Sequence, residues 1–281
     1  MKHQTEYPGG KLLLFMKKNE IVIKFSVILS IFFLSAFLLP ATGTAAGWYL
    51  RGTVGYEKSL TADFSDTNCA SANPPALFGC ANGNNGQPIG AYGDFGRFPL
   101  VEAAVGRQLL PWLRADLSVA YRFNMDYSGN ANFLNVGANQ PVSAKADSLS
   151  GMVNLFVDIN GLLAGKKLWR FQPYVGGGAG LSYNRIGQMT FRYPDNPGAH
   201  KVSITPSGDR KDFAFMLAVG TGVMLTGQLS LDVAYRYFDL GRVETSPGNM
   251  YMDTRPAGIA VNGIESRLRT HGPAVGLRYQ F

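Results

Sequence analysis

The chain has 281 residues, and its 26 basic and 19 acidic side chains give a net charge of +7. Two cysteines and three histidines are too few and too scattered to complete a structural zinc site, so we predict no metal. The glycines of VGGGAG at 175–180 fit neither the dinucleotide-binding nor the P-loop spacing, and we predict no cofactor.

Residues 1–46 have the features of a cleavable secretory signal peptide. Lysines precede a nearly uninterrupted apolar run over 25–39, and small residues follow up to Ala46. The run is shorter than the roughly 20 residues that a membrane-spanning helix needs, which disfavours a retained anchor. We predict cleavage after Ala45 or between Ala46 and Gly47, and a mature domain over 47–281. Met16 is an alternative start of the chain.

Much of the positive charge belongs to this segment. Removing residues 1–46 removes five of the 26 basic and two of the 19 acidic side chains, which leaves a net charge of +4. A mature chain this mildly basic does not support nucleic-acid binding.

Cys69 and Cys80 lie in a short polar segment, CASANPPALFGC. A secreted chain with an even number of cysteines favours a disulfide, and we predict one between these two residues.

Eight segments of the mature chain alternate apolar and polar side chains, which is the period of two expected of β-strands. The clearest is LRADLSVAYRF, and VGLRYQF closes the chain with the same pattern. In chain order, the predicted strands cover 48–57, 99–108, 113–123, 148–158, 171–183, 212–223, 228–238 and 274–281.

The connections between these strands alternate in length. Long polar stretches follow the first, third, fifth and seventh strands, such as 58–96 and 184–211, whereas short links follow the second and sixth. Short turns at one end and long loops at the other are typical of outer-membrane barrels.

Period-two alternation fits both a membrane barrel and a soluble barrel, so other features decide which face is outside. Trp48, Trp112 and Trp169 fall at the turn end with Tyr279 and Phe281. A second set of aromatic residues falls near the opposite end, and two aromatic girdles match the two interfaces of a bilayer.

Charged residues occupy the opposite face of the strands, where a narrow barrel requires them to neutralise one another. The alternative is a row of solvated charges outside a soluble barrel. The predicted lumen network comprises Arg51, Glu102, Arg114, Asp116, Arg122, Asp158, Asp232, Arg236 and Arg278, with Glu57, Arg170 and Asp212 on the same face.

These patterns predict an all-β fold: a closed eight-stranded antiparallel up-and-down transmembrane β-barrel. Because hydrocarbon satisfies no backbone polar group, the last strand has to pair with the first. An even number of strands places both termini at the turn end, which we expect to be periplasmic in a Gram-negative outer membrane.

From GWYLRGTVGYEKS through PYVGGGAGLSY and LDVAYRYFDLG to VGLRYQF, the mature chain resembles the small outer-membrane barrels related to the OmpA transmembrane domain, particularly opacity-type and "porin family" surface antigens of alphaproteobacteria. The resemblance implies assembly by the barrel-assembly machinery, with Tyr279 and Phe281 as the recognition signal. A cysteine pair in the first loop is not general in that family.

A barrel of this kind could have one of three functions. The first is a structural or surface barrel that presents its loops for envelope integrity or interaction, because eight strands enclose a lumen that side chains can fill. The second is a narrow pore for small ions or solutes, gated by the lumen charges. The third is a lipid-modifying enzyme using His271, Ser266 and Glu265, but 266 and 271 have opposite strand parity, and we predict no catalysis.

Expected partners are the bilayer, lipopolysaccharide and host or cell-surface ligands. The 184–211 loop carries a surplus of cations that could meet phosphates or acidic glycans, or could simply be solvated. Its charged side chains are Arg185, Arg192, Lys201, Arg210 and Lys211 against Asp195 and Asp209. We expect the glycines of the fifth strand to make room for large lumen neighbours such as arginines.

Overall fold

The structure is a computed structural model that describes residues 47–162 and 170–281. The predicted signal peptide, including Ala46, and the predicted girdle residue Trp169 lie outside the described residues.

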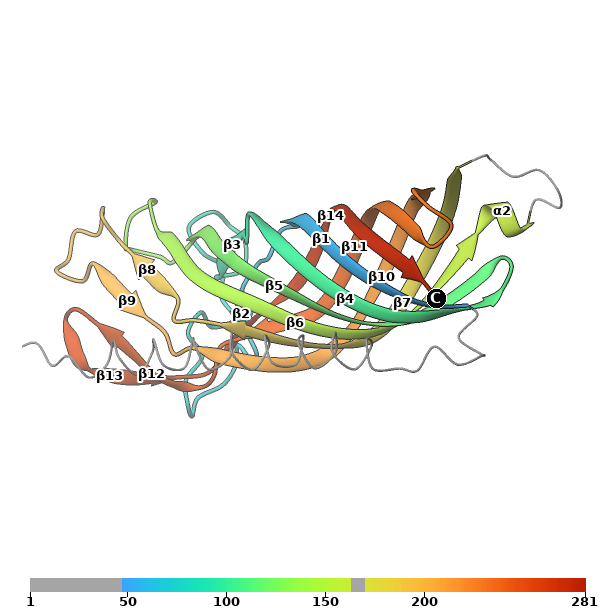
Figure 1. Cartoon of the computed structure of the whole chain (residues 1–281). Coiled ribbons are helices and arrows are strands. Elements are labelled where there is room, and N and C mark those ends of the chain that lie inside the picture. Colours follow the sequence, from blue (N-terminus) through green and yellow to red (C-terminus); the bar gives the residue numbers. More distant parts are fainter. Residues whose placement is uncertain (1–46, 163–169) are drawn as a thin grey trace, which may run out of the picture. The chain divides into compact units, whose positions relative to one another are not determined.

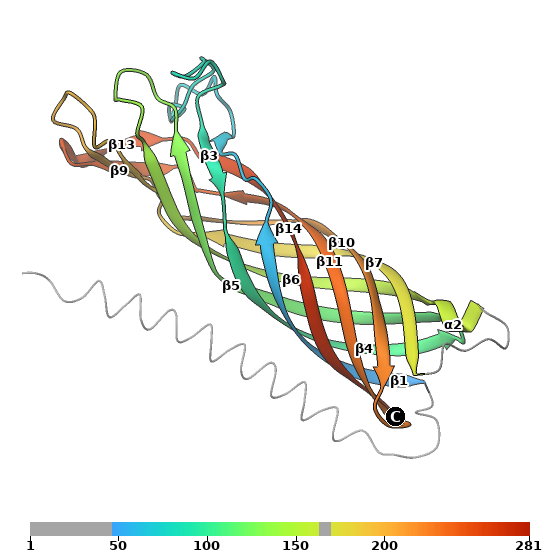
Figure 2. The ribbon, with the colours of Figure 1, turned by 90° about the horizontal axis from the view of Figure 1, so that it is seen from above.

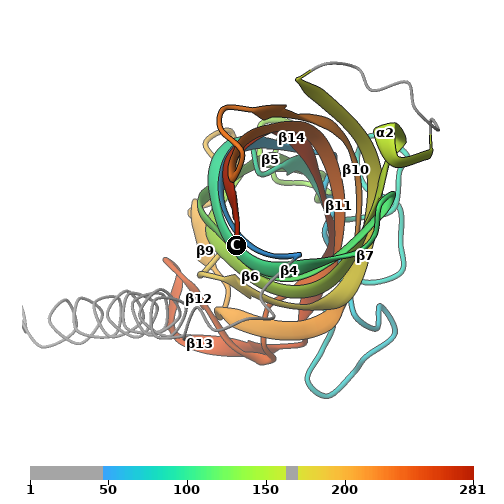
Figure 3. The same cartoon turned by 45° about the vertical axis from the view of Figure 1, so that its right-hand side comes forward.

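Eight long antiparallel strands form a closed ring, as predicted (Figure 3). Each strand pairs with the next along the chain, and the last pairs with the first through a register that includes Tyr49 opposite Gln280 and Val54 opposite Val275. The strands are β1 (Trp48–Ser59), β4 (Arg97–Leu110), β5 (Leu113–Ala131), β6 (Pro141–Asp158), β7 (Phe171–Ile186), β10 (Gly208–Met224), β11 (Leu229–Glu244) and β14 (Ile264–Gln280).

The two ends of the barrel differ, as Figures 1 and 2 show. Short connections and the four-residue helix α2 (Ile159–Leu162) lie at the end that holds the C-terminus. We call the connections at the other end the crown: loop 1 (60–96), loop 2 (132–140), loop 3 (187–207) and loop 4 (245–263). The crown contains the short strands β2 (Ser65–Asp66), β3 (Ala91–Asp94), β8 (Thr190–Arg192), β9 (Val202–Ile204), β12 (Gly248–Met252) and β13 (Arg255–Val261).

The short strands of the crown continue the barrel wall along its axis, beyond the ends of the long strands. β3 pairs with the end of β5, and β2 pairs with the start of β14. β8 pairs with β6, and the order continues through β9 and β12 to β13. The crown is therefore largely β-structure, where the sequence indicated only loops.

Side chains alternate between the two faces of the wall, as the sequence predicts. Leu181 is 67% exposed on the outer face, whereas Ser182 beside it is 2% exposed on the inner face. An outer face of exposed Val, Leu and aromatic side chains matches hydrocarbon, because no water-soluble fold gains by displaying so many of them.

Two strands, β5 and β11, continue past a β-bulge and so extend beyond their predicted ends. Asn124 has a φ of 56°, and the pairing of β5 with β6 shifts register between Arg122 and Met125. Gly241 has a φ of 72°, where β11 shifts against β14. A bulge inserts an unpaired residue and exchanges the two faces, so strict alternation stops although the strand continues.

No helix in the described ranges has both the length and the hydropathy needed to cross a membrane.

Candidate functional site

The middle of the lumen is held together by a chain of buried ion pairs from strands on opposite sides of the barrel. Arg51 Nη1 lies 2.9 Å from Glu102 Oε1, and its Nη2 lies 2.7 Å from Asp116 Oδ2. Arg236 Nη1 lies 2.8 Å from the other oxygen of Glu102. Tyr49 and Asn154 also donate to Asp116, which leaves both of its oxygens occupied.

A second buried pair lies toward the crown. Arg122 Nε lies 2.7 Å from Glu57 Oε2, and neither side chain is more than 1% exposed. Thr270 donates to the same carboxylate at 2.8 Å, and Arg122 donates to Ser150 at 3.0 Å. Glu57 thus neutralises the most deeply buried arginine of the barrel.

Two further pairs lie toward the turn end. Arg114 Nε is 2.8 Å from Asp158 Oδ2, and Arg278 Nε is 3.1 Å from Asp232 Oδ2. The structure brings all nine residues of the predicted lumen network, together with Glu57, into ion pairs. Asp212 lies at the crown end, where it pairs with Arg210 at 3.6 Å and accepts the backbone N–H of residue 242. Arg170 lies outside the strands, after β6 and α2.

Aromatic rings pack among these charges and exclude water. Arg122 stacks over the ring of Phe238 at 4.2 Å, and Arg114 lies 4.9 Å from the centroid of Tyr174 and 5.2 Å from that of Phe156. Cation–π contacts of this kind stabilise a desolvated guanidinium.

The glycines of β7 that face the lumen make room for large side chains, as predicted, but these neighbours are not arginines. A Cβ on Gly176 would lie 2.3 Å from the ring of Phe156, and one on Gly178 would lie 1.9 Å from Asn154 Oδ1. The close neighbours are a ring and an amide because β6, which carries both, is the strand paired with β7.

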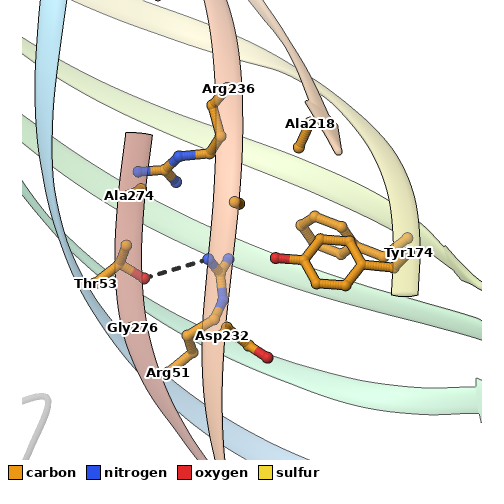
Figure 4. Close-up of a pocket in the computed structure, with 10 residues that line it drawn as sticks. Arg51, Thr53, Tyr174, Ala218, Asp232, Arg236, Ala274 and Gly276 are labelled. Atoms are coloured by element: carbon orange, nitrogen blue, oxygen red, sulfur yellow. Dashed lines mark hydrogen bonds between the residues drawn. The ribbon is translucent and has the colours of Figure 1, made fainter. Parts of the chain in front are cut away.

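A small cavity remains at the centre of the network (Figure 4). Its volume is about 10 Å³, which is room for about one water molecule. Arg236 lines it and has two nitrogens, Nε and Nη2, without a partner in the described residues. A cavity of this size can accommodate one water molecule and is too small to be a channel by itself.

Beyond the bulges, the lumen is filled by an apolar layer that the sequence did not reveal. Phe64 and Phe95, both from loop 1, contact Tyr127 with ring centroids 5.0 and 5.3 Å apart. We call this layer the apolar plug and define it as the buried side chains of Phe64, Phe95, Phe98, Met125, Tyr127, Leu240, Val243, Ile264 and Leu268.

Loop 1 is held as a rigid unit above the plug. The predicted disulfide between Cys69 and Cys80 is present, with a Cα–Cα distance of 5.0 Å. The carboxylate of Asp66 accepts the backbone N–H groups of residues 77, 78 and 79 at 2.8–2.9 Å. Burial raises the pKa of Asp66, although these three hydrogen bonds act to lower it. Phe78 then packs on Phe133 of loop 2 and Phe191 of loop 3.

An open groove of about 770 Å³ lies between loops 1 and 2. Amides and one aromatic ring dominate its lining, which is Asn84, Asn85, Gln87, Tyr92, Asn130, Ala131, Asn132, Ala138 and Asn139. The buried Asn132 donates to Asn85, and the hydroxyl of Tyr92 donates to the carbonyl of Pro88. These contacts hold the groove in shape before any ligand arrives.

Most cations of the 184–211 segment already have partners. Arg210 binds Glu244 and Glu265, and Arg185 lies directly opposite Asp147 and Asp209 on the neighbouring strands. Lys201 donates to backbone carbonyls of its own loop. Strong attraction of anions by this segment is therefore not supported.

The aromatic residues predicted for the girdles lie on the outer face of the barrel. Trp48, Tyr279 and Phe281 are exposed at the turn end, and Trp112 lies in the turn between β4 and β5. Nearer the crown, Tyr56 and Phe213 are exposed, and the other predicted residues of the second girdle are partly exposed, namely Tyr121, Phe123, Tyr183 and Tyr237.

The three residues weighed for catalysis do not come together. Ser266 is buried on the inner face, with its hydroxyl unpaired among the described residues. His271 contacts the hydroxyl of Tyr235, and Glu265 binds Arg210 and Arg242. No group of three metal-ligating side chains occurs in the part of the chain that the structure describes.

A closed eight-stranded ring with a lipid-facing aliphatic band and a charged interior defines a small outer-membrane β-barrel. Residues 27–281 match the family described as "Outer membrane protein beta-barrel domain", and the chain belongs to that family. Its place is therefore the outer membrane.

Known proteins that resemble the chain include an uncharacterised protein of Brucella abortus (strain 2308), 26% identical over 84% of this chain and 85% of that protein. The outer membrane protein PagN of Salmonella typhimurium is 22% identical over 60% of this chain, and the match spans 65% of PagN's length. The crystal structure of Neisserial surface protein A covers 84% of this chain and 98% of its own, with a TM-score of 0.40 and 16% identity.

Proposed function

We propose that this barrel is a closed scaffold that holds a rigid crown outside the cell for surface interaction and envelope integrity. The observation that carries the proposal is the filling of the lumen in two successive layers. Ion pairs and rings occupy its middle, and the apolar plug occupies its outer part. Because both layers fill the lumen with packed side chains, we expect no path for a hydrated ion.

Planar-bilayer recording of the purified protein tests closure. We expect no discrete conductance steps from the wild type, and none from a Glu102→Gln variant that remains folded by heat-modifiable gel migration. Steps that change in size when Arg114 or Asp116 is substituted would show that the lumen network gates a pore, which is the alternative function.

The same proposal makes the barrel non-catalytic. Ser266 and His271 lie on opposite faces of β14, so His271 is not placed to act as a base for that hydroxyl. Mass spectrometry of lipid A from cells with and without the protein should show identical species. A new or missing acyl chain that depends on His271 would instead assign the barrel an enzymatic role.

We infer that the termini face the periplasm and the crown faces outward. The short connections and the C-terminus share one end of the barrel, which is the periplasmic end of known bacterial barrels. In this orientation Tyr279 and Phe281 remain the proposed assembly signal. Deleting Phe281 should lower the amount of heat-modifiable protein in the outer membrane, and unchanged assembly would reject that role.

The groove between loops 1 and 2 is the proposed contact surface of the crown. The side-chain amides of Asn84, Asn130 and Asn139 have no hydrogen-bond partner in the described residues. Amides pair with hydroxyl-rich ligands as donor and acceptor at once. We therefore infer a neutral glycan as the ligand class. Saturation-transfer NMR with chitotriose and lacto-N-tetraose tests it: loss of transfer in Asn130→Ala would support the groove, and transfer only with sulfated sugars would contradict it.

A further inference from the structure

The outer wall carries two contrasting charge patterns near the crown. On β5, β6, β7 and β10, acidic and basic side chains lie directly opposite each other. Asp126 faces Lys145, with 3.0 Å between their charged atoms, and Arg185 faces both Asp147 and Asp209. Opposite charges in cross-strand positions stabilise a sheet, so this side is balanced within the protein itself.

On the adjoining strands the pattern is reversed. Lys58 of β1 lies directly opposite Arg97 of β4 on one side and His271 of β14 on the other. The side chains of Lys58 and Arg97 are both exposed, and neither side chain has a hydrogen bond or an ion pair with any described residue. Like charges directly opposite each other destabilise a sheet.

Nearby acidic groups are already engaged. Asp94 accepts the N–H of residue 96, and Asp239 on β11 is bound by Arg267. Glu57, the neighbour of Lys58 along β1, points into the lumen and binds Arg122. The Lys58–Arg97 pair therefore lacks a counter-charge among these groups.

The position of the pair indicates where a counter-charge would come from. Tyr56, two residues before Lys58 on the same face of β1, is exposed and belongs to the aromatic girdle near the crown. Two residues of a strand span about 7 Å, so the cations stand just beyond the girdle, at the level of lipid headgroups.

We propose that Arg97 and Lys58, flanked by His271, bind the phosphate groups of a phosphorylated glycolipid in the outer leaflet. Arginine can hold a phosphate through two parallel N–H donors, and lysine adds a compact positive charge. His271 uses Nδ1 for the hydroxyl of Tyr235, which leaves Nε2 for a further hydrogen bond. The proposal rests on the outward orientation of the crown inferred above.

Thermal unfolding in a neutral detergent, with increasing amounts of added lipid, tests the site. We expect bisphosphorylated lipid A to raise the melting temperature of the wild type, because a ligand that binds only the folded state stabilises it. In Lys58→Gln/Arg97→Gln the apparent affinity should fall about 10- to 30-fold. Lys145→Gln/Arg185→Gln, which removes the same charge from the balanced side, should bind as the wild type does.

Two further lipids identify the ligand. Dephosphorylated lipid A should leave the melting temperature unchanged, and phosphatidylglycerol should bind more weakly than bisphosphorylated lipid A. Equal binding of phosphatidylglycerol, equal binding by the two double variants, or binding of dephosphorylated lipid A would each overturn the proposal. Conductance steps in planar-bilayer recording would reject the closed scaffold but would not affect the lipid-binding result. Failure of the proposed function can therefore be distinguished from failure of the proposed lipid site.

Discussion

Glu102 lies between Arg51 and Arg236 and pairs with both, and it is the carboxylate that neutralises Arg236, whereas Arg51 also binds Asp116. Breaking a buried pair leaves an uncompensated charge, which costs about 3–5 kcal/mol. Glu102→Gln should therefore lower the free energy of unfolding by about that amount in urea titrations of the barrel in lipid vesicles. Lys145→Gln, which breaks the exposed pair with Asp126, should change it by less than about 1 kcal/mol. Equal effects would mean that the lumen pairs are not desolvated.

Gly178 and Gly52 allow a matched test of packing in the wall. A Cβ on Gly178 meets the amide of Asn154, which would lose its bonds to Asp116 and Ser118, whereas a Cβ on Gly52 meets nothing within 4 Å. We expect Gly178→Ala to destabilise the barrel by about 1–3 kcal/mol and Gly52→Ala to be nearly neutral. Identical urea midpoints for the two variants would show that Asn154 moves without cost.

The contact between loops 3 and 4 should depend on pH through Asp253. Burial acts to raise the pKa of this carboxyl, but hydrogen bonds from the backbone of Lys201 and Val202 and from His200 outweigh it and lower the pKa. A depressed pKa stabilises the contact above the ordinary aspartate value, near 3.9, and that stabilisation is lost as the pH falls through the lower folded value.

We therefore expect limited proteolysis of loop 3 to be slow from pH 5 to 7 and to accelerate in acid, with an acid-stable protease as the probe. The Asp253→Asn variant should be cleaved at a rate that does not increase when the pH is lowered from 7 into the acid range. A wild-type rate independent of pH would show that Asp253 does not hold the two loops together.

At the scale of elements, alternation was sufficient to predict all eight barrel strands but not their outer ends. Val119 and Tyr121 follow the period of two, whereas Asn124 interrupts it and Met125 resumes it on the other face. A bulge of this kind has no signal in the hydrophobic pattern beyond an Asn that tolerates positive φ. The β5 strand was therefore predicted to end at 123 although it continues to Ala131.

The disulfide of loop 1 lies within the crown, so its removal should affect the crown and not the barrel. Replacing Cys69 and Cys80 by serine removes a loop constraint worth on the order of 2–3 kcal/mol. We expect faster cleavage within 66–80 on intact cells, with unchanged heat-modifiable migration of the barrel. Loss of the heat-modifiable migration would show instead that the disulfide is needed for the barrel to assemble.

At the scale of the whole molecule, the sequence predicted the ring and the identity of its charged face, because both depend on local parity. It did not predict the apolar plug, because Phe64 and Phe95 come from segments that read as polar loop and enter the barrel only through long-range pairing. The partners within the network, such as Arg236 with Glu102, are likewise set by closure of the ring rather than by spacing along the chain.

The central claim is that eight strands close in the outer membrane around a filled lumen and carry the crown outside. The most direct measurement is gel migration of the outer-membrane fraction, with and without boiling, after protease treatment of intact cells. The account predicts one band whose migration changes on boiling and whose cuts fall only within loops 1 to 4. A band unchanged by boiling, or cuts at the short connections after β4 and β10, would contradict it.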